Sequence, residues 1–97
     1  HVESKGYSIV RELVGHGIGT KLHLEPQVPN FSNPTSSDHN VELKEGMCLA
    51  IEPMVNLGSR FIKTDSDGWT IRTQDGQPSA HFEHSILITK LQPRILT

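Results

Sequence analysis

Two glutamates lie within apolar segments of the chain. Glu52 follows Leu49-Ala50-Ile51, and Glu83 lies between Phe82 and the apolar run 86–88. An ionised carboxylate in such a setting is costly unless it is paired with a cation or bound to a metal ion. Two such segments in one short chain favour a shared cation site. The alternative, that strand alternation points both side chains to water, stays open from these residues alone.

Two histidines add donors of a different kind. His16 lies between glycines in Gly15-His16-Gly17, so that backbone can come close to whatever its ring contacts. An imidazole with several carboxylates suits divalent first-row metals, and Mn, Fe, Co and Zn are all reasonable. His23 could hydrogen-bond a substrate carbonyl or a developing oxyanion near such a metal. Each could instead be an ordinary loop histidine bonded to backbone or facing solvent.

Three further residues are candidates for a site or for structure. His81 precedes Glu83 by two positions, so it shares a strand face with Glu83 and could line a substrate site. His84 falls on the opposite face and is interpreted as structural. Trp69 is most simply interpreted as core packing, with the wall of a substrate pocket as the alternative.

The elements that must position these residues are mostly strands. The polar segment 1–5 is predicted to end a helix at Gly6, and the proline-containing segment 24–39 to be a loop. The Gly15–Gly19 segment is expected to turn or to pack closely against other backbone. Turns are expected at 44–46, 56–59, 65–68 and 74–77. Strands are predicted at 7–14, 47–55, 61–64, 69–73, 80–89 and 94–97. The fold class is therefore α+β, with a curved, mainly antiparallel sheet.

Composition narrows the class of protein. The chain has 97 residues, 34% of them hydrophobic, and a net charge of −2, so nucleic-acid binding is not expected. No stretch approaches the roughly 20 apolar residues of a membrane helix. The single cysteine, Cys48, favours a reducing, cytoplasmic setting. Because the chain begins at His1 and its apolar content is low, we interpret residues 1–97 as a segment of a longer protein.

Taken together, the motifs resemble the type I methionine aminopeptidase family of the pita-bread fold. Their order and spacing agree along nearly the whole chain. The matching segments are Gly15-His16-Gly17-Ile18-Gly19, His23, Glu25-Pro26, Leu43-Lys44-Glu45-Gly46-Met47, Ile51-Glu52-Pro53-Met54-Val55-Asn56, Asp67-Gly68-Trp69-Thr70 and Ser79-Ala80-His81-Phe82-Glu83-His84.

This resemblance implies a two-metal centre held by His16, Glu52 and Glu83, with Glu83 bridging both ions. It implies that His23 contacts the substrate or the tetrahedral intermediate, and Glu52 is a plausible proton acceptor. The implied reaction is metal-assisted hydrolysis that removes the initiator methionine from nascent proteins, with ribosome association as an open option. The implied fold is half of a pita bread, with helices on the outer face of the sheet in the intact protein.

One departure from the family pattern bears on activity. The resemblance implies two aspartates and a further histidine from an N-terminal half, and no segment here resembles the strands that carry them. Residues 1–97 are therefore expected to form the C-terminal portion of a single catalytic domain. Since a site without two carboxylates binds metal weakly, the 97-residue chain alone is expected to be inactive.

Two rival interpretations remain. One is a proline-specific aminopeptidase or dipeptidase of the same fold, which usually has a glycine at the position of Met54. The other is a pita-bread relative that has lost catalysis and serves as a binding module. Intact His16, Glu52 and Glu83 argue against this second interpretation.

Overall fold

The computed structural model describes residues 1–32 and 41–97, and in this part of the chain almost all regular structure is β. One short 3₁₀ helix, η1, spans Glu3–Lys5 and ends at Gly6, whose φ of 84° is left-handed. The strands are β1 (Ser8–Ile9), β2 (Gly15–Ile18), β3 (Leu24–Val28), β4 (Cys48–Ile51), β5 (Met54–Asn56), β6 (Ile62–Thr64), β7 (Ile71–Thr73), β8 (Ser79–His81), β9 (His84–Leu87) and β10 (Arg94–Ile95).

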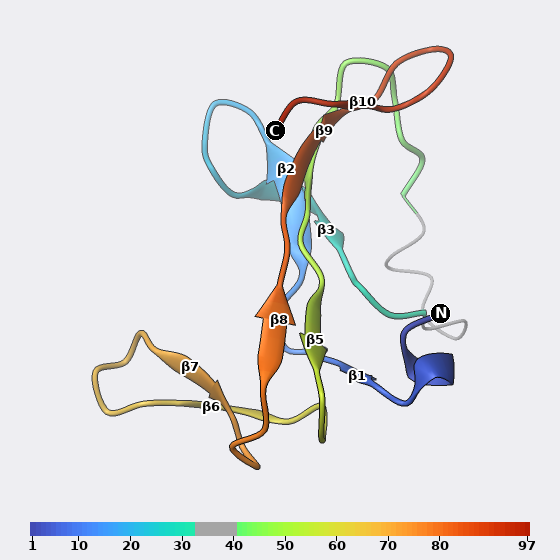
Figure 1. Ribbon diagram of the computed structural model, residues 1–97. Coiled ribbons are helices and arrows are strands. Elements are labelled where there is room, and N and C mark those ends of the chain that lie inside the picture. The colour runs from blue at the N-terminus through green and yellow to red at the C-terminus, as the bar shows by residue number, and fades with distance from the viewer. Residues whose placement is uncertain (33–40) are drawn as a thin grey trace.

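The strands form two sheets and a separate hairpin (Figure 1). The larger sheet has the order β10-β9-β4-β2-β3, the smaller has the order β1-β5-β8, and β6 pairs with β7. All pairs are antiparallel. The α+β prediction of a mainly antiparallel sheet is confirmed, with helical structure in the described residues limited to η1.

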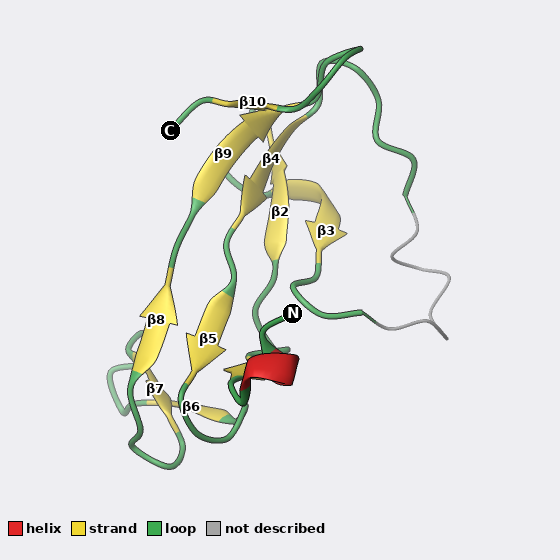
Figure 2. Cartoon of the chain, turned by 45° about the vertical axis from the view of Figure 1, so that its right-hand side comes forward, coloured by secondary structure: helices red, strands yellow, loops and turns green. Residues whose placement is uncertain are grey.

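The two sheets share one long, interrupted ribbon of two chain segments. β5 continues β4, and β9 continues β8 (Figure 2). Ile51 pairs with His84 before the interruption, and Met54 pairs with His81 after it. The single predicted strands 47–55 and 80–89 are thus each two strands. Both breaks fall at the candidate site residues, Glu52-Pro53 on one side and Phe82-Glu83 on the other.

Glycines let β2 pack closely between β4 and β3 in the larger sheet. β2 pairs with β4 on one side and β3 on the other. A Cβ at Gly15 would clash with the carbonyl of Ala50, and one at Gly17 with the carbonyl of Glu25. The expectation of close backbone packing is therefore confirmed, but the segment is a strand rather than a turn.

Three other predictions need correction. The strand predicted at 7–14 is reduced to β1, and the chain then bends before β2. The loop predicted at 24–39 begins with β3, although Pro26 lies inside it. The strand at 69–73 starts only at Ile71, since Trp69 belongs to the preceding turn. Residues 33–39 of that predicted loop lie outside the described residues.

The β6–β7 hairpin extends away from the ribbon and is closed by a turn built on Asp67 (Figure 1). Its carboxylate accepts hydrogen bonds from the Thr70 hydroxyl and from the backbone N–H groups of Trp69 and Thr70. The Thr70 hydroxyl bond is the main reason that the pKa of Asp67 lies below its usual value. Arg72 donates to Asp65 at 2.6 Å across the same hairpin.

The apolar core of the described residues is small. Ile9, Val10, Leu49 and Ala50 are the buried hydrophobic residues, and they lie on β1, β4 and the bend after β1. None of the helical structure described here has the length or the apolar character needed to cross a bilayer. A core of this size makes the contacts of β2, which pairs on both edges, important for stability.

We predict that Gly17→Ala destabilises the protein by about 1–3 kcal/mol, because the new Cβ meets backbone carbonyls that cannot move alone. The matched control is Gly19→Ala, whose Cβ meets only the end of the flexible Leu24 side chain. Urea denaturation of both variants measures the difference. Equal unfolding midpoints for the two would contradict the close approach.

Candidate metal centre

Glu52 occupies the break between β4 and β5 and points into the molecule. Its side chain is only 15% exposed. The Asn30 side-chain amide donates to its backbone carbonyl at 3.4 Å, which ties the break to the segment after β3. The sequence-based interpretation of Glu52 as a shielded carboxylate therefore agrees with its place in the structure.

His16 faces this carboxylate from the neighbouring strand. Its Nε2 lies 3.3 Å from Glu52 Oε1, and its side chain is 13% exposed. The other ring nitrogen, Nδ1, lies 2.9 Å from the carbonyl of Gly17. A carbonyl only accepts, so Nδ1 carries the proton, and in the neutral ring Nε2 presents a lone pair to Glu52. Two lone pairs face each other stably only with a cation, either a proton or a metal ion, between them.

The spacing of these two atoms also fits a shared metal ion. Two donor atoms bound to one ion at about 2.1 Å lie about 3.0–3.5 Å apart. The bond from His16 Nδ1–H to a backbone carbonyl is the arrangement that commonly fixes a metal-binding imidazole. A register shift in the β2–β3 ladder between His16 and Gly17 accompanies this orientation.

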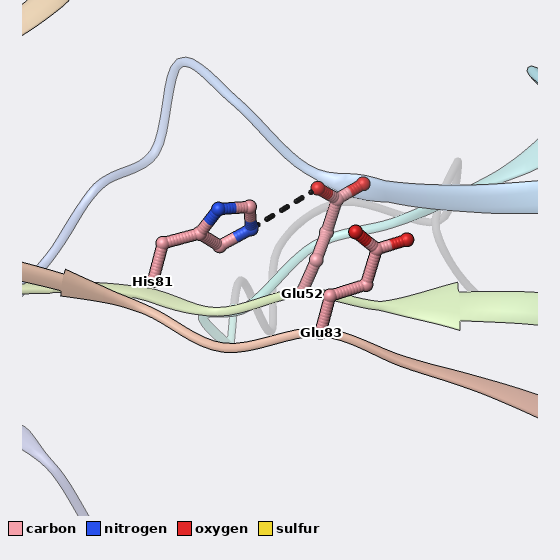
Figure 3. Close-up of side chains that lie close together, drawn as sticks. All are labelled: Glu52, His81 and Glu83. Atoms are coloured by element: carbon pink, nitrogen blue, oxygen red, sulfur yellow. Dashed lines mark ion pairs between the residues drawn. The ribbon is translucent and has the colours of Figure 1, made fainter. Parts of the chain in front are cut away.

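Glu83 lies beside Glu52 on the second half of the interrupted ribbon (Figure 3). One ligand atom each of Glu52, His81 and Glu83 lies within 4.8 Å of the others. Glu83 itself is exposed, so the expectation of an apolar environment is wrong for this residue in the described structure. Its proximity to Glu52 follows from the break, where the flanking pairs Ile51–His84 and Met54–His81 keep the two segments in register.

His23 joins the group from the loop between β2 and β3. Its ring packs edge-on against that of His16, with centroids 4.3 Å apart. The residue is exposed, so that its ring can meet a molecule bound at the site.

His81 and Trp69 border a cavity of about 1080 Å³ next to Glu52. Trp69 is 86% exposed, so its interpretation as core packing is wrong. The other lining residues include His16, His23, Met54, Ile62 and Ile71, which give part of the wall an apolar character. The cavity thus connects the polar group to the β6–β7 hairpin.

The aspartates in the described residues have structural partners. Asp65 and Asp67 stabilise the β6–β7 hairpin, as described above. Asp75 accepts hydrogen bonds from the backbone N–H groups of Ser59 and Gln77, and the Ser59 bond is the main cause of its lowered pKa. Leaving these residues out of the candidate site agrees with their contacts, whereas Asp38 lies outside the described residues.

Sequence reasoning missed one contact of the site. His81 Nε2 lies 3.3 Å from Glu52 Oε2, a direct pairing between the two halves of the ribbon. The signal was available, since His81 and Glu83 were placed on one face, but the partner strand of that face was not known. His84 instead pairs its Nδ1 with the Thr97 carbonyl at 2.7 Å, away from the site.

The donors that converge here fit a divalent metal ion. The group that comes within 4.8 Å comprises Glu52, His81 and Glu83, and His16 joins it through its 3.3 Å contact with Glu52. Carboxylates with imidazole are a ligand set for Mn, Fe, Co or Zn. Comparison with known proteins agrees with this chemistry, because the model of metallopeptidase family M24 matches residues 1–90. The chain belongs to metallopeptidase family M24.

Several methionine aminopeptidases are similar to the chain along its whole length. A methionine aminopeptidase of Clostridium perfringens and methionine aminopeptidase 1 of Bacillus subtilis are each 53% identical over all 97 residues. The crystal structure of a methionine aminopeptidase from Thermotoga maritima superposes with a TM-score of 0.91 at 50% identity, covering 99% of this chain and 37% of that one. The chain spans 38% of the length of the two curated relatives. The resemblance in sequence and the predicted pita-bread portion are therefore confirmed.

We predict that His16→Ala and Glu83→Ala each weaken Mn²⁺ binding at least about 10-fold, because each removes a donor from the site. Isothermal titration calorimetry measures the affinity. His84→Ala is the matched control, since His84 bonds to the Thr97 carbonyl outside the site. Unchanged affinity in both site variants would show that the ligand assignment is wrong.

Proposed function

We propose that this protein is a metal-dependent aminopeptidase that removes the N-terminal methionine from peptides, with His16, Glu52 and Glu83 as metal ligands. The observation that carries the proposal is the Nε2 atom of His16 facing Glu52 Oε1 at 3.3 Å, with its proton held on Nδ1. The identity of about 50% to methionine aminopeptidases supports this specificity within the family.

Different residues of the chain have different roles in the proposed reaction. His16, Glu52 and Glu83 would hold divalent ions, whose chemistry would be to activate a water and to polarise the scissile carbonyl. Glu52 accepts a proton, since its carboxylate is shielded from bulk water and lies among the proposed ligands. His23 donates to the substrate carbonyl, or to the charge that develops on it, from its position against the His16 ring.

The cavity beside Glu52 receives the methionine side chain in this proposal. Trp69 and Ile71 from the β6–β7 hairpin and Met54 from β5 provide apolar contacts for a thioether side chain. His81 lines the same cavity and lies 3.3 Å from Glu52, so that its ring can contact the bound substrate as well as Glu52.

The remaining expectations belong to the same proposal. We infer that His16, Glu52 and Glu83 would hold two divalent ions, that Glu83 would be shared between them, and that Mn, Fe, Co or Zn would serve. Residues 1–97 form the C-terminal portion of one catalytic domain, which agrees with the 38% coverage of the relatives. The substrates are nascent proteins in the cytoplasm, where ribosome association would bring the enzyme to them.

Both rival functions are less well supported. Identity over the whole chain is to methionine aminopeptidases, and Met54 lies where the proline-specific enzymes usually have glycine. A non-catalytic binding module would have no need for His16 to lie against Glu52 or for Glu83 to lie beside it.

Peptidase assays on the protein purified from its own cells test the proposal. With Mn²⁺ added, we expect methionine release from Met-Ala-Ser and little hydrolysis of Leu-Ala-Ser or Ala-Pro-Ser, measured by chromatography of the free amino acids. Preferred cleavage of Ala-Pro-Ser would favour the proline-specific rival, and no cleavage of any peptide would favour the binding module.

The same assay tests the role of His23. His23→Ala should lower kcat about 10²-fold, because it removes one donor to the developing oxyanion. Mn²⁺ affinity should stay close to that of the unmodified protein, and His84→Ala should leave kcat unchanged. An unaltered kcat in His23→Ala would remove His23 from the mechanism.

A further inference from the structure

The Glu52 carboxylate lies between two imidazoles that contact different oxygens. His16 Nε2 is 3.3 Å from Oε1, and His81 Nε2 is 3.3 Å from Oε2. The two histidines come from β2 and from the end of β8, on opposite sides of the strand break that holds Glu52. One carboxylate is thus fixed from two directions by two distinct parts of the fold.

The two imidazoles differ in what their second nitrogen contacts. The Nδ1 atom of His16 lies 2.9 Å from the Gly17 carbonyl and must carry a proton, which leaves Nε2 as an acceptor. Within residues 1–32 and 41–97, the Nδ1 atom of His81 makes no protein hydrogen bond. No contact therefore forces the proton of His81 onto Nδ1, and Glu52 Oε2 draws that proton to Nε2.

We propose that His81 is a positioning residue that donates its Nε2–H to Glu52 Oε2, while Oε1 faces the metal side with His16. This inference rests on the proposed metal centre and adds a residue that acts through Glu52. Carboxylates that bind metal are commonly held by a hydrogen bond of this kind, which orients the binding oxygen. Without His81, the Glu52 side chain in the strand break is free to rotate away from His16.

Two observations favour this role over direct metal binding by His81. Its side chain is 48% exposed, whereas those of Glu52 and His16 are 15% and 13% exposed. In the view of Figure 3, Glu52 lies between His81 and Glu83, so that the imidazole reaches the carboxylate from the side away from the second glutamate. The His81 ring comes within 4.8 Å of both carboxylates, but its exposure and its approach to Glu52 Oε2 suit a donor that orients the carboxylate.

Nitrogen NMR tests which ring nitrogen of His81 and of His16 carries the proton. The sample is the protein purified from its own cells. Long-range ¹H–¹⁵N spectra with Zn²⁺ bound should show His81 with its proton on Nε2 and His16 with its proton on Nδ1. Loss of the Nε2 proton of His81 on Zn²⁺ addition would show that His81 binds the metal, and the proposal would be wrong.

Calorimetric titration with Zn²⁺ provides the second readout. His81→Ala should weaken binding about 10-fold, within the range seen when such a supporting hydrogen bond is removed. His81→Gln keeps an N–H donor and should restore most of the affinity. His84→Gln, the same change in the neighbouring residue, should have no effect, because His84 contacts Thr97.

The outcomes separate this inference from the proposed function. If Zn²⁺ affinity depends on His16 and Glu83 but is unaffected in His81→Ala, the metal centre stands and the positioning role fails. If Zn²⁺ does not bind at all, the proposed function fails with it. Equal losses in His81→Ala and His81→Gln would also contradict a role based on hydrogen-bond donation.

Discussion

The contact between the His16 imidazole and the Glu52 carboxylate is the constraint on which the functional account depends. Both side chains are largely shielded, and the proton on His16 is held on the nitrogen that faces away from Glu52. Shielded lone pairs that face each other are destabilising unless a cation lies between them. A proton or a metal ion can supply that cation, and membership of metallopeptidase family M24 favours the metal ion.

The glycines of β2 and the two strand breaks place these side chains together. Glycines at 15 and 17 allow β2 to pack between β3 and β4, which brings His16 opposite Ala50 on the strand that leads to Glu52. The paired breaks in the long ribbon then let Glu52 and Glu83 lie side by side without a regular ladder between them. A glycine-rich strand and two interruptions would be unfavourable in a protein selected for stability alone.

The sequence predicted the strands well where apolar residues run together, as in 47–55 and 80–89, because a buried strand requires such a run of apolar residues. It did not predict the breaks inside them, since Glu52-Pro53 and Phe82-Glu83 interrupt the ladder through local geometry that depends on the partner segment. The strand β2 was missed because its glycines have low strand propensity, and the close approach of Ala50 and Glu25 that favours them is a tertiary effect. The candidate ligands could be named from the resemblance, whereas the His81 contact and the exposure of Trp69 required coordinates.

The most direct test of the metal centre is X-ray diffraction from crystals of the protein grown with Mn²⁺, with anomalous scattering recorded near the manganese absorption edge. The account predicts an anomalous peak within bonding distance, about 2.0–2.3 Å, of His16 Nε2 and of a carboxylate oxygen of both Glu52 and Glu83. No peak at these atoms, in crystals where the ion has reached other sites, would contradict it.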